Sequence, residues 1–325
     1  MRKIAILTSG GDAPGMNAAV LAIAKSAKVN NLEPYVVLEG YKGLYHNQIT
    51  KANTLELAQA SSKGGTVIYS ARFPEFKDPQ IRQVAIDNLK KHQIDSLVVI
   101  GGDGSYMGAQ ALHEAGVKTI ALPGTIDNDI ASSDITIGYD TALNTIVGAI
   151  DKIRDTATSH KRIMIIEVMG NQCGDLALYS GLATGAEIIA TSEYRPSVEE
   201  IVKKTKELIE QPGRRSVLIV VSEKYYNLKQ LEQEIEQATG WATRINPLNH
   251  IQRGGTPSAQ ERINASLMGI KAVEYLIQGK SGLAIGILNN HIFATPILQA
   301  LSMTNPAKEK AIDHAIKFNK LNQVN

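Results

Sequence analysis

The chain has 325 residues, of which 43% are hydrophobic and 20% are charged, and its formal net charge is +2. This balance is typical of a globular protein large enough for two lobes, and it gives no support for nucleic acid or a membrane surface as a partner. The single cysteine, Cys173, excludes an intrachain disulfide and indicates a reducing compartment. The histidines lack the spacing of metal ligands, so a structural zinc site is not expected. No apolar run approaches the ~20 residues of a membrane span, and we predict a cytoplasmic protein.

A glycine-rich corner follows the first predicted strand. Residues 4–8 are apolar enough for a buried strand, and several glycines separate them from an Ala-rich helix that runs to about Lys28. The glycine spacing resembles a P-loop, but Met16 and Asn17 stand where that motif needs Lys and Ser or Thr. The pattern therefore predicts a phosphate-friendly corner of another kind.

The pair Arg72-Phe73 lies in a loop after a short strand predicted at 35–38. A guanidinium in such a loop can contact phosphate, and a ring can lie beside a base. A solvent-facing arginine and a core phenylalanine explain the pattern equally well. Asp78 and Pro79 then begin a helix that we interpret as structural.

A second glycine corner follows the strand predicted at 97–100. Gly101, Gly102, Asp103, Gly104 and Ser105 lead from it into a helix near residue 106. Ligands bind at the carboxyl ends of strands in open α/β sheets, where glycines expose backbone N–H groups and a helix N-terminus adds partial positive charge. A carboxylate beside phosphates implies Mg²⁺. The alternative is a tight turn in which the serine is an N-cap.

Two carboxylates lie close together after the strand predicted at 119–122. Asp127 and Asp129 belong to an irregular segment, 123–129, at the carboxyl end of that strand. One of them can act as a base while the other orients Mg²⁺ or neighbouring side chains. An Asx-rich turn that caps the next element is the alternative.

Helices and strands alternate through the rest of the chain. Ser197 and Glu200 form a capping box, and Asn227 and Gly240 bound a later helix. The segment 243–255 is predicted as a loop whose arginines and histidine suit an anion, although a solvated loop is the alternative. The patterns predict helices at 139–158, 176–189, 197–210, to 277 and near 305–320, and strands at 162–168, 216–221 and 283–287.

Together these motifs resemble the bacterial ATP-dependent 6-phosphofructokinase family. The runs Pro-Gly-Thr-Ile-Asp-Asn-Asp and His-Ile-Gln-Arg-Gly-Gly are highly specific for it, whereas the glycine-aspartate-glycine corner also occurs in NAD kinases and lipid kinases. The resemblance covers nearly the whole chain and is carried by residues 8–17, 70–76, 98–108, 122–129, 167–170 and 250–257.

The resemblance implies an α/β fold of two Rossmann-like three-layer lobes, with mostly parallel sheets and the active site in the cleft between them. The ATP-binding lobe is expected at 1–138 with 251–304, and the fructose 6-phosphate-binding lobe at 139–250 with 305–325. A homotetramer is also implied, in which Arg162 and Arg244 reach the active site of a neighbouring subunit.

The implied reaction is transfer of a phosphoryl group from MgATP to the 1-hydroxyl of fructose 6-phosphate. Asp127 matches the general base, Asp103 the Mg²⁺ ligand and Asp129 a further partner of the metal. The matching ATP contacts are Gly11, Arg72, Phe73, Gly102, Asp103, Gly104 and Ser105. The matching substrate contacts are Thr125, Asp127, Arg162, Met169, Gly170, Asn171, Glu223, Arg244, His250 and Arg253.

Two glycines in the resemblance imply that ATP is the donor. Pyrophosphate-dependent relatives generally carry Asp at the position of Gly104 and Lys at that of Gly124. The chain departs from the family at Asn171, where Arg is usual, so we expect the backbone there to matter more than the side chain. A rival NAD kinase is disfavoured by the 250–255 run, and a non-catalytic sugar-phosphate sensor by the presence of Asp103 and Asp127.

The family is allosteric, and the effector residues of this chain are incomplete. Leu21, Thr54 and Pro212 stand where basic residues are usual. Each lost cation removes a contact worth about 1.5–3 kcal/mol, so we expect weak or absent control by nucleoside diphosphate or phosphoenolpyruvate. The effector residues that match or keep a charge are Lys25, Arg154, Glu187, Arg214 and Arg215.

Overall fold

The computed structural model describes residues 2–304 and 307–324. These residues form two compact units. The first unit holds residues up to 126, then 130–141 and those from 253 to 304, and the second holds 127–129, 142–252 and those from 307 onward. Asp127–Asp129 therefore group with the second unit, apart from the strand that precedes them.

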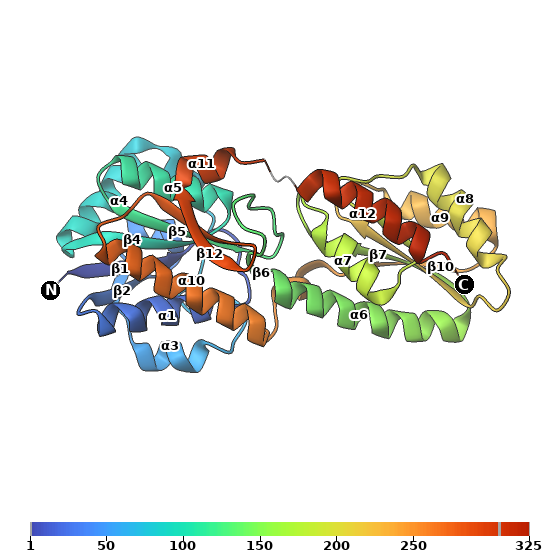
Figure 1. The fold of residues 1–325 in the computed structure, drawn as a ribbon, viewed down its shortest axis with the longest axis horizontal. Helices are drawn as coiled ribbons and strands as arrows, with labels where there is room; N and C mark the ends of the chain where they lie inside the picture. The colour runs from blue at the N-terminus through green and yellow to red at the C-terminus, as the bar shows by residue number, and fades with distance from the viewer. Residues whose placement is uncertain (1, 305–306, 325) are drawn as a thin grey trace. The chain divides into compact units, whose positions relative to one another are not determined.

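The first unit is built on a mostly parallel sheet. Its order is β12-β11-β5-β4-β1-β2-β3, in which β12 and β3 are antiparallel edge strands and β6 pairs with β5. Figure 1 shows α1, α3 and α10 on one face and α4, α5 and α11 on the other. The strands are β1 Lys3–Thr8, β2 Glu33–Val37, β3 Ile49–Lys51, β4 Ile94–Gly101, β5 Lys118–Thr125, β6 Ile137–Gly138, β11 Leu283–Leu288 and β12 His291–Pro296. The helices are α1 Met16–Val29, α2 Gly40–Tyr45, α3 Thr54–Ala60, the 3₁₀ turn η1 Pro74–Lys77, α4 Pro79–Lys91, α5 Asp103–Glu114, α10 Ala259–Ile277 and α11 Ile297–Ser302.

Helices on both faces explain why the central strands are continuously apolar. Leu97, Val98, Val99 and Ile100 of β4 are all fully buried. A parallel strand covered on both sides has no solvent face and so needs no alternation. The sequence prediction of a buried strand before each glycine corner is confirmed by β1 and β4.

The second unit has a smaller, fully parallel sheet of order β10-β7-β9-β8. The predicted capping box is confirmed: Ser197 accepts from the Glu200 backbone N–H while Glu200 accepts from that of Ser197. Asn227 likewise caps the helix that Gly240 ends in a left-handed conformation. The elements are α6 Tyr139–His160, β7 Arg162–Val168, α7 Asp175–Thr184, β8 Ile188–Ala190, α8 Val198–Ile209, β9 Ser216–Ser222, α9 Leu228–Thr239, β10 Thr243–Pro247, the 3₁₀ turn η2 Asn249–Arg253 and α12 Ala307–Leu321.

The predicted helix at 176–189 and the predicted loop at 243–255 were partly wrong. Helix α7 ends at Thr184 because Gly185, with φ of 62°, turns the chain out of the helix. The buried, β-branched residues Ile188 and Ile189 then form the short strand β8. Residues 243–247 are strand β10, whose partner is β7, a pairing that local sequence does not reveal.

Other boundaries also differ from the predictions. Strands β3 and β12 were not predicted, and α5 begins at Asp103 rather than near residue 106. The predicted start of the last helix near residue 305 lies outside the described residues, and α12 is seen from Ala307. None of the helices in the described ranges is long and apolar enough to cross a membrane.

Candidate active site

The two glycine corners are neighbours in the first unit. β1 and β4 pair in parallel, so that Thr8 lies beside Ile100 at their carboxyl ends. The Ser9 backbone N–H donates to the Ile100 carbonyl at 2.9 Å, and the Ser105 hydroxyl donates to the Ser9 carbonyl at 3.1 Å. Ser105 therefore links the two corners through this hydrogen bond. The alternative in which it caps the helix is wrong because Gly102 holds the N-cap position.

The glycines of the second corner differ in the space around them. A Cβ at Gly101 would overlap the Ser105 hydroxyl and the Ser9 carbonyl oxygen, so packing requires glycine there. A Cβ at Gly102 or Gly104 would meet no atom within 4 Å. The start of α5 is thus an open floor of backbone, where a phosphate can approach N–H groups.

The carboxylate of Asp103 is exposed on this floor, in the first turn of α5. Mg²⁺ is usually held by one or two carboxylates together with substrate phosphates, and it keeps several waters. One exposed oxygen ligand beside two unfilled glycine positions fits a metal that is bound in that way. The described residues contain no group of three or more His, Cys, Asp or Glu side chains that could hold a metal by themselves.

Asn17 fixes the loop that precedes Arg72. Its side chain accepts from the Val67 backbone N–H at 2.7 Å and donates to the Lys63 carbonyl at 3.1 Å. The Thr8 hydroxyl at the end of β1 donates to the Tyr69 carbonyl at 2.8 Å. Asn17, one of the two residues that depart from the P-loop pattern, therefore positions this loop, a role that the sequence motifs did not predict.

The loop that holds Arg72 and Phe73 is joined to the first glycine corner by a hydrogen bond. The Ser70 hydroxyl donates to the Gly10 carbonyl at 2.8 Å. Arg72 is exposed, whereas Phe73 is half-buried and lies against Tyr45 with 5.7 Å between ring centroids. The structure thus supports a core contact on one side of Phe73 and an arginine that points to solvent.

Two further predicted residues lie in the first unit. The Arg253 guanidinium donates to the Asp12 carbonyl at 3.3 Å, and its Nη1 would be 2.7 Å from a Cβ at Gly11. Thr125 is the last residue of β5, and its carbonyl accepts from the Thr136 hydroxyl at 2.7 Å. Arg253 therefore covers the turn at Gly11. The resemblance had assigned Gly11 to the ATP contacts and Arg253 to the substrate contacts.

In the second unit, the loop Asp127–Asp129 is held by amide–carboxylate hydrogen bonds. Asn128 is buried and left-handed, with φ of 52°, a conformation that Asn tolerates better than most residues. Its Nδ2 donates to Asp175 Oδ2 at 2.8 Å, and Asn171 Nδ2 donates to Asp129 Oδ2 at 3.0 Å. Asp127 itself is half-buried.

Asn171 also contacts the sugar-side residues predicted from the sequence. Its backbone N–H donates to Glu223 Oε1 at 3.0 Å, and its side-chain oxygen accepts from Lys224 Nζ at 2.8 Å. The Met169 backbone N–H donates to Gln252 Oε1 at 3.0 Å. We expected the backbone of Asn171 to matter more than its side chain, but both are engaged. Asp175 and Lys224 had no predicted role.

Burial shapes the ionisation of this region. It raises the pKa of Asp175, against the hydrogen bond from Asn128, and it raises that of the Cys173 thiol, which is therefore no nucleophile at neutral pH. Burial, and then the charge of Glu223, raises the pKa of Glu167. Carboxylates gathered at the ends of β7 and β9 thus interact through space, as is common where a ligand is bound.

Arg162 and Arg244 lie at the other end of the small sheet. Arg162 begins β7, whereas Met169 follows its end, so about 20 Å of strand separates them. Arg244 pairs in register with Met164, near the same amino end, and is exposed. The second unit therefore does not bring these arginines to Met169 and Glu223. His250 is exposed in η2.

Three of the predicted effector residues form a closed cluster in the second unit. Buried Glu187 accepts from Arg214 at 2.8 Å and from the Leu218 backbone N–H at 2.7 Å, and it lies 3.8 Å from Arg154. Arg215 donates to the carbonyls at the end of α6. Lys25 belongs to α1 of the first unit and is exposed.

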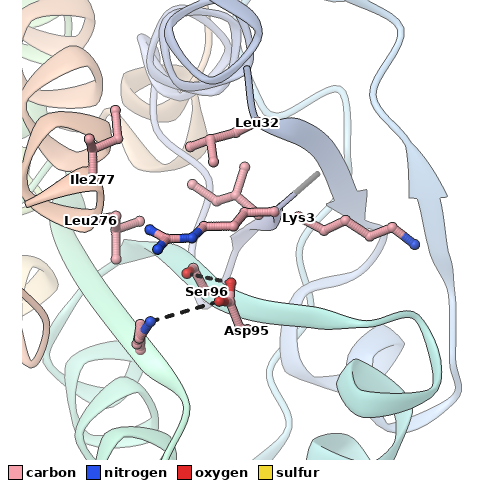
Figure 2. A pocket seen from close by; sticks show the side chains of 9 residues that line it. Lys3, Leu32, Asp95, Ser96, Leu276 and Ile277 are labelled. Carbon is pink, nitrogen blue, oxygen red and sulfur yellow. Dashed lines mark hydrogen bonds and ion pairs between the residues drawn. The ribbon is translucent and has the colours of Figure 1, made fainter. Parts of the chain in front are cut away.

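Figure 2 shows a hollow in the first unit that is not part of this site. Its lining includes Lys3, Asp95, Ser96 and Lys118, which begin β1, β4 and β5 or lie close to their starts. The glycine corners lie at the opposite, carboxyl ends of these strands. An ion pair of 3.8 Å joins Asp95 and Lys118 beside the hollow.

An open parallel sheet with two adjoining glycine corners at its carboxyl edge defines an α/β protein that binds phosphate-bearing ligands. The family model described as phosphofructokinase matches residues 3–276. The chain belongs to the phosphofructokinase family.

Relatives and solved structures agree with this assignment. Proteins named ATP-dependent 6-phosphofructokinase from Mycoplasmopsis pulmonis and Mycoplasma mobile are 56% and 54% identical to this chain, with 99% of each chain covered. The phosphofructokinase structure from Saccharomyces cerevisiae is similar with a TM-score of 0.88 and 33% identity over 98% of this chain, which spans only 48% of the yeast chain. A pyrophosphate-dependent phosphofructokinase from Marinobacter aquaeolei, 18% identical over 98% of this chain and 91% of its own, shares the fold with a TM-score of 0.84.

Proposed function

We propose that this enzyme transfers the γ-phosphoryl group of ATP to the 1-hydroxyl of fructose 6-phosphate, giving fructose 1,6-bisphosphate and ADP in glycolysis. The observation that carries the proposal is the open backbone floor at Gly102 and Gly104 with the Asp103 carboxylate exposed on it. Relatives that match over the full length and are named ATP-dependent 6-phosphofructokinase support the same reaction.

On the nucleotide side, backbone N–H groups of the two corners bind the phosphates, and Asp103 holds Mg²⁺. When bound, the ion neutralises phosphate charge and orients the transferring group. Arg72 adds a fixed positive charge to the same group, and its exposure and anchored loop suit that task. Thr125 lies beside the transferred phosphoryl group, and Gly11, Phe73 and Ser105 complete the nucleotide contacts.

Asp127 acts as the general base and accepts the proton of the 1-hydroxyl as the oxygen attacks phosphorus. The proton leaves as the new O–P bond forms, so an ordinary carboxylate suffices. Asp129 supports the metal and the loop geometry. The hydrogen bonds at Asn128 and Asp129 support this assignment because a base is effective only when it is held in position.

On the sugar side, Met169, Gly170, Asn171 and Glu223 contact the sugar hydroxyls, while His250 and Arg253 assist in binding its phosphate. The clustering of Met169, Asn171 and Glu223 at the ends of β7 and β9 supports this set. Arg162 and Arg244 bind the 6-phosphate of a neighbouring subunit's substrate. Their place at the amino ends of β7 and β10 supports action on another copy, since their own unit keeps them from Met169.

Self-association as a homotetramer follows from this sharing of sites. Helix α10 supports it with a row of large apolar side chains that are 40–52% exposed in the single chain, namely Ile263, Leu267, Ile270 and Ile277. A contiguous exposed apolar row on one helix commonly marks a protein interface. Sedimentation at micromolar concentration tests the tetramer; a monomer would contradict it.

The two glycines support ATP as the donor in different ways. Gly104 leaves open space for the inner phosphates of ATP. A Cβ at Gly124 would lie 2.8 Å from Met16 Cε and 3.0 Å from the Gly101 backbone nitrogen, so a side chain there, such as the lysine of pyrophosphate-dependent relatives, requires its neighbours to shift. We also propose a cytoplasmic location, consistent with a lone, buried cysteine.

A coupled assay for ADP release tests the reaction. The purified chain with MgATP should release ADP only when fructose 6-phosphate is added. Release with NAD in its place would indicate the rival kinase class, and binding of the sugar phosphate without turnover would indicate a sensor. Pyrophosphate should not replace ATP.

Mixed oligomers test the sharing of sites between subunits. Asp127→Ser and Arg244→Ala should each be nearly inactive. Co-expressed together, they should regain measurable activity, because some sites then combine Asp127 of one copy with Arg244 of another. If Arg244 served its own chain, every site would keep one defect and no activity would return.

A further inference from the structure

We propose that Asn171 and Asp175 are positioning residues that hold the Asp127–Asp129 loop from its two sides. The inference rests on the proposed function, because it concerns the loop that carries the general base. Neither residue needs to touch the sugar or the nucleotide through its side chain to act in this way.

The loop needs support because its backbone and charges are unfavourable on their own. Asn128 is left-handed, and its neighbours Asp127 and Asp129 carry like charges two residues apart. Left-handed backbone at a residue other than glycine persists only where the surrounding structure holds it in place. Burial of Asn128 also demands partners for its amide.

Both supports come from the segment that follows β7: Asn171 from the turn and Asp175 from the start of α7. The loop donates through Asn128 Nδ2 to Asp175 Oδ2 at 2.8 Å and accepts through Asp129 Oδ2 from Asn171 Nδ2 at 3.0 Å. The two bonds therefore run in opposite directions, and each joins a neutral amide to a carboxylate, a stronger pairing than two neutral groups. In the sequence, Asp127 is adjacent to Asn128, which makes the first bond, and stands two residues before Asp129, which makes the second.

The supporting turn is itself rigid. Gly170 has φ of 149°, and a Cβ there would overlap the Cys173 carbonyl oxygen. The Cys173 backbone N–H donates to the Gly170 carbonyl at 2.8 Å, which closes a turn around Asn171. Asn171 thus lies inside this turn, and Asp175 is the first residue of α7, two positions after the turn.

The amide of Asn171 is oriented by a charge at each end. Its nitrogen donates to the Asp129 carboxylate, and its oxygen accepts from the Lys224 ammonium at 2.8 Å. A flipped amide would place its NH₂ against the ammonium and its oxygen against the carboxylate, so only one orientation is favourable. Because the Asn171 backbone also donates to Glu223, one residue links the base loop to the sugar-side carboxylate.

Steady-state kinetics of Asp175→Ala and Asn171→Ala test the proposal. Each should lower kcat about 10- to 100-fold, because a small misplacement of a catalytic group is costly, while KM for fructose 6-phosphate changes less than about threefold for Asp175→Ala. Asp175→Asn keeps an acceptor oxygen for Asn128 and should restore kcat to within about threefold of wild type. A merely structural residue would not give this split and rescue.

A double-mutant cycle identifies the pair that carries the effect. Asn128→Ala combined with Asp175→Ala should cost no more than the worse single change, because both remove the same bond. The matched control is Glu234→Ala in α9, where Gln230 donates to Glu234 at 2.9 Å in an equivalent but exposed amide–carboxylate pair. That variant should keep wild-type kcat. If Asp175→Ala fails to fold, Asn171→Ala and Asn128→Ala carry the test.

Amide hydrogen exchange gives a readout that needs no reaction. The peptide around 124–130 should exchange about tenfold faster in Asp175→Ala and Asn171→Ala than in wild type and Glu234→Ala. Unchanged exchange, or kcat within threefold of wild type for both variants of an active enzyme, overturns the proposal. A wild-type protein without activity on fructose 6-phosphate contradicts the proposed function, while the exchange data still decide this inference.

Discussion

In the first unit, the carboxyl ends of β1 and β4 present mainly backbone, whereas in the second unit the carboxyl ends of β7 and β9 present side chains. Gly101 is fixed by packing, and Gly102 and Gly104 face open space. In the second unit, Asn128 and Asn171 are fixed by hydrogen bonds to carboxylates. The first surface depends on the absence of side chains at its glycines, whereas the second depends on side chains that form hydrogen bonds.

The difference predicts how each surface responds to mutation. Phosphates are recognised by N–H groups that every residue carries, so the first surface is damaged when a side chain is added. Sugar hydroxyls and the transferred proton need placed oxygen and nitrogen atoms, so the second surface is damaged when a side chain is truncated. The following tests, from the largest expected effect to the smallest, address this contrast.

Truncation of Asp127 is the strongest test of the side-chain surface. Asp127→Ser should lower kcat about 10³-fold, in the range that general-base catalysis contributes, while fructose 6-phosphate affinity stays within about threefold. Stopped assays at saturating substrate measure kcat, and calorimetric titration measures affinity. Activity within tenfold of wild type would show that the base is misassigned.

The first unit also holds a buried carboxyl group, Glu261, close to the first glycine corner: a Cβ at Gly15 would lie 2.8 Å from its Cγ. Burial raises the pKa of Glu261, near the start of α10, to about 7, although the Thr141 N–H and hydroxyl donate to it at 3.2 Å. The folded protein then keeps a proton between about pH 4.5 and 7 that the unfolded chain releases. Stability from this group is therefore present at low pH and lost as the pH rises through 7.

Denaturant unfolding of wild type and Glu261→Gln measures this effect. From pH 5 to pH 8, the stability of wild type relative to the variant should fall by roughly 2–3 kcal/mol. Glu274→Gln, on the same helix with a partly exposed ion pair to Lys271, is the control and should leave the profile parallel to wild type. A rise in relative stability across this range would contradict the assigned ionisation.

Added methyl groups test the backbone surface directly. Gly101→Ala forces a Cβ onto the Ser9 carbonyl oxygen and should cost about 1–3 kcal/mol of stability, together with most activity. Gly104→Ala adds the same atom to open space in the first turn of α5 and should keep the melting temperature. Its effect should instead be a raised KM for ATP. Equal destabilisation by both changes would remove the distinction between them.

The smallest expected effect concerns regulation. Glu187 already lies against Arg154 and Arg214, and basic residues are missing at Leu21, Thr54 and Pro212. Fructose 6-phosphate saturation curves with and without millimolar phosphoenolpyruvate should differ less than about twofold at half-saturation. A large shift would mean that an effector still binds despite the missing cations.

The sequence predicted local features well and long-range contacts poorly. The strands before both corners, the cap at Asn227 and the capping box at Ser197 were correct because neighbouring residues specify them. Strand β10 was missed because only its pairing with β7 distinguishes it from a loop. Helix α7 was extended over β8 because a left-handed glycine within an apolar run was overlooked.

In the candidate site, too, residues recognised from local motifs were predicted, and residues defined by long-range contacts were missed. Asp103 and Asp127 stand in recognisable runs, and their roles were predicted from those runs. Asn17 and Lys224 gave no such signal, because their partners lie about 50 residues away in the chain. Side chains that position other side chains are recognised only when the fold brings them together.

The unequal space around Gly104 and Gly124 sets apart the two positions on which the proposed choice of ATP over pyrophosphate rests. A Cβ at 104 would meet no atom within 4 Å. A Cβ at 124 would lie 2.8 Å from Met16 Cε, 2.9 Å from Ile100 Cγ2 and 3.0 Å from the Gly101 backbone nitrogen, so any side chain there requires these neighbours to shift. A substitution at 124 therefore depends on how its core neighbours move, whereas a substitution at 104 meets no such neighbour.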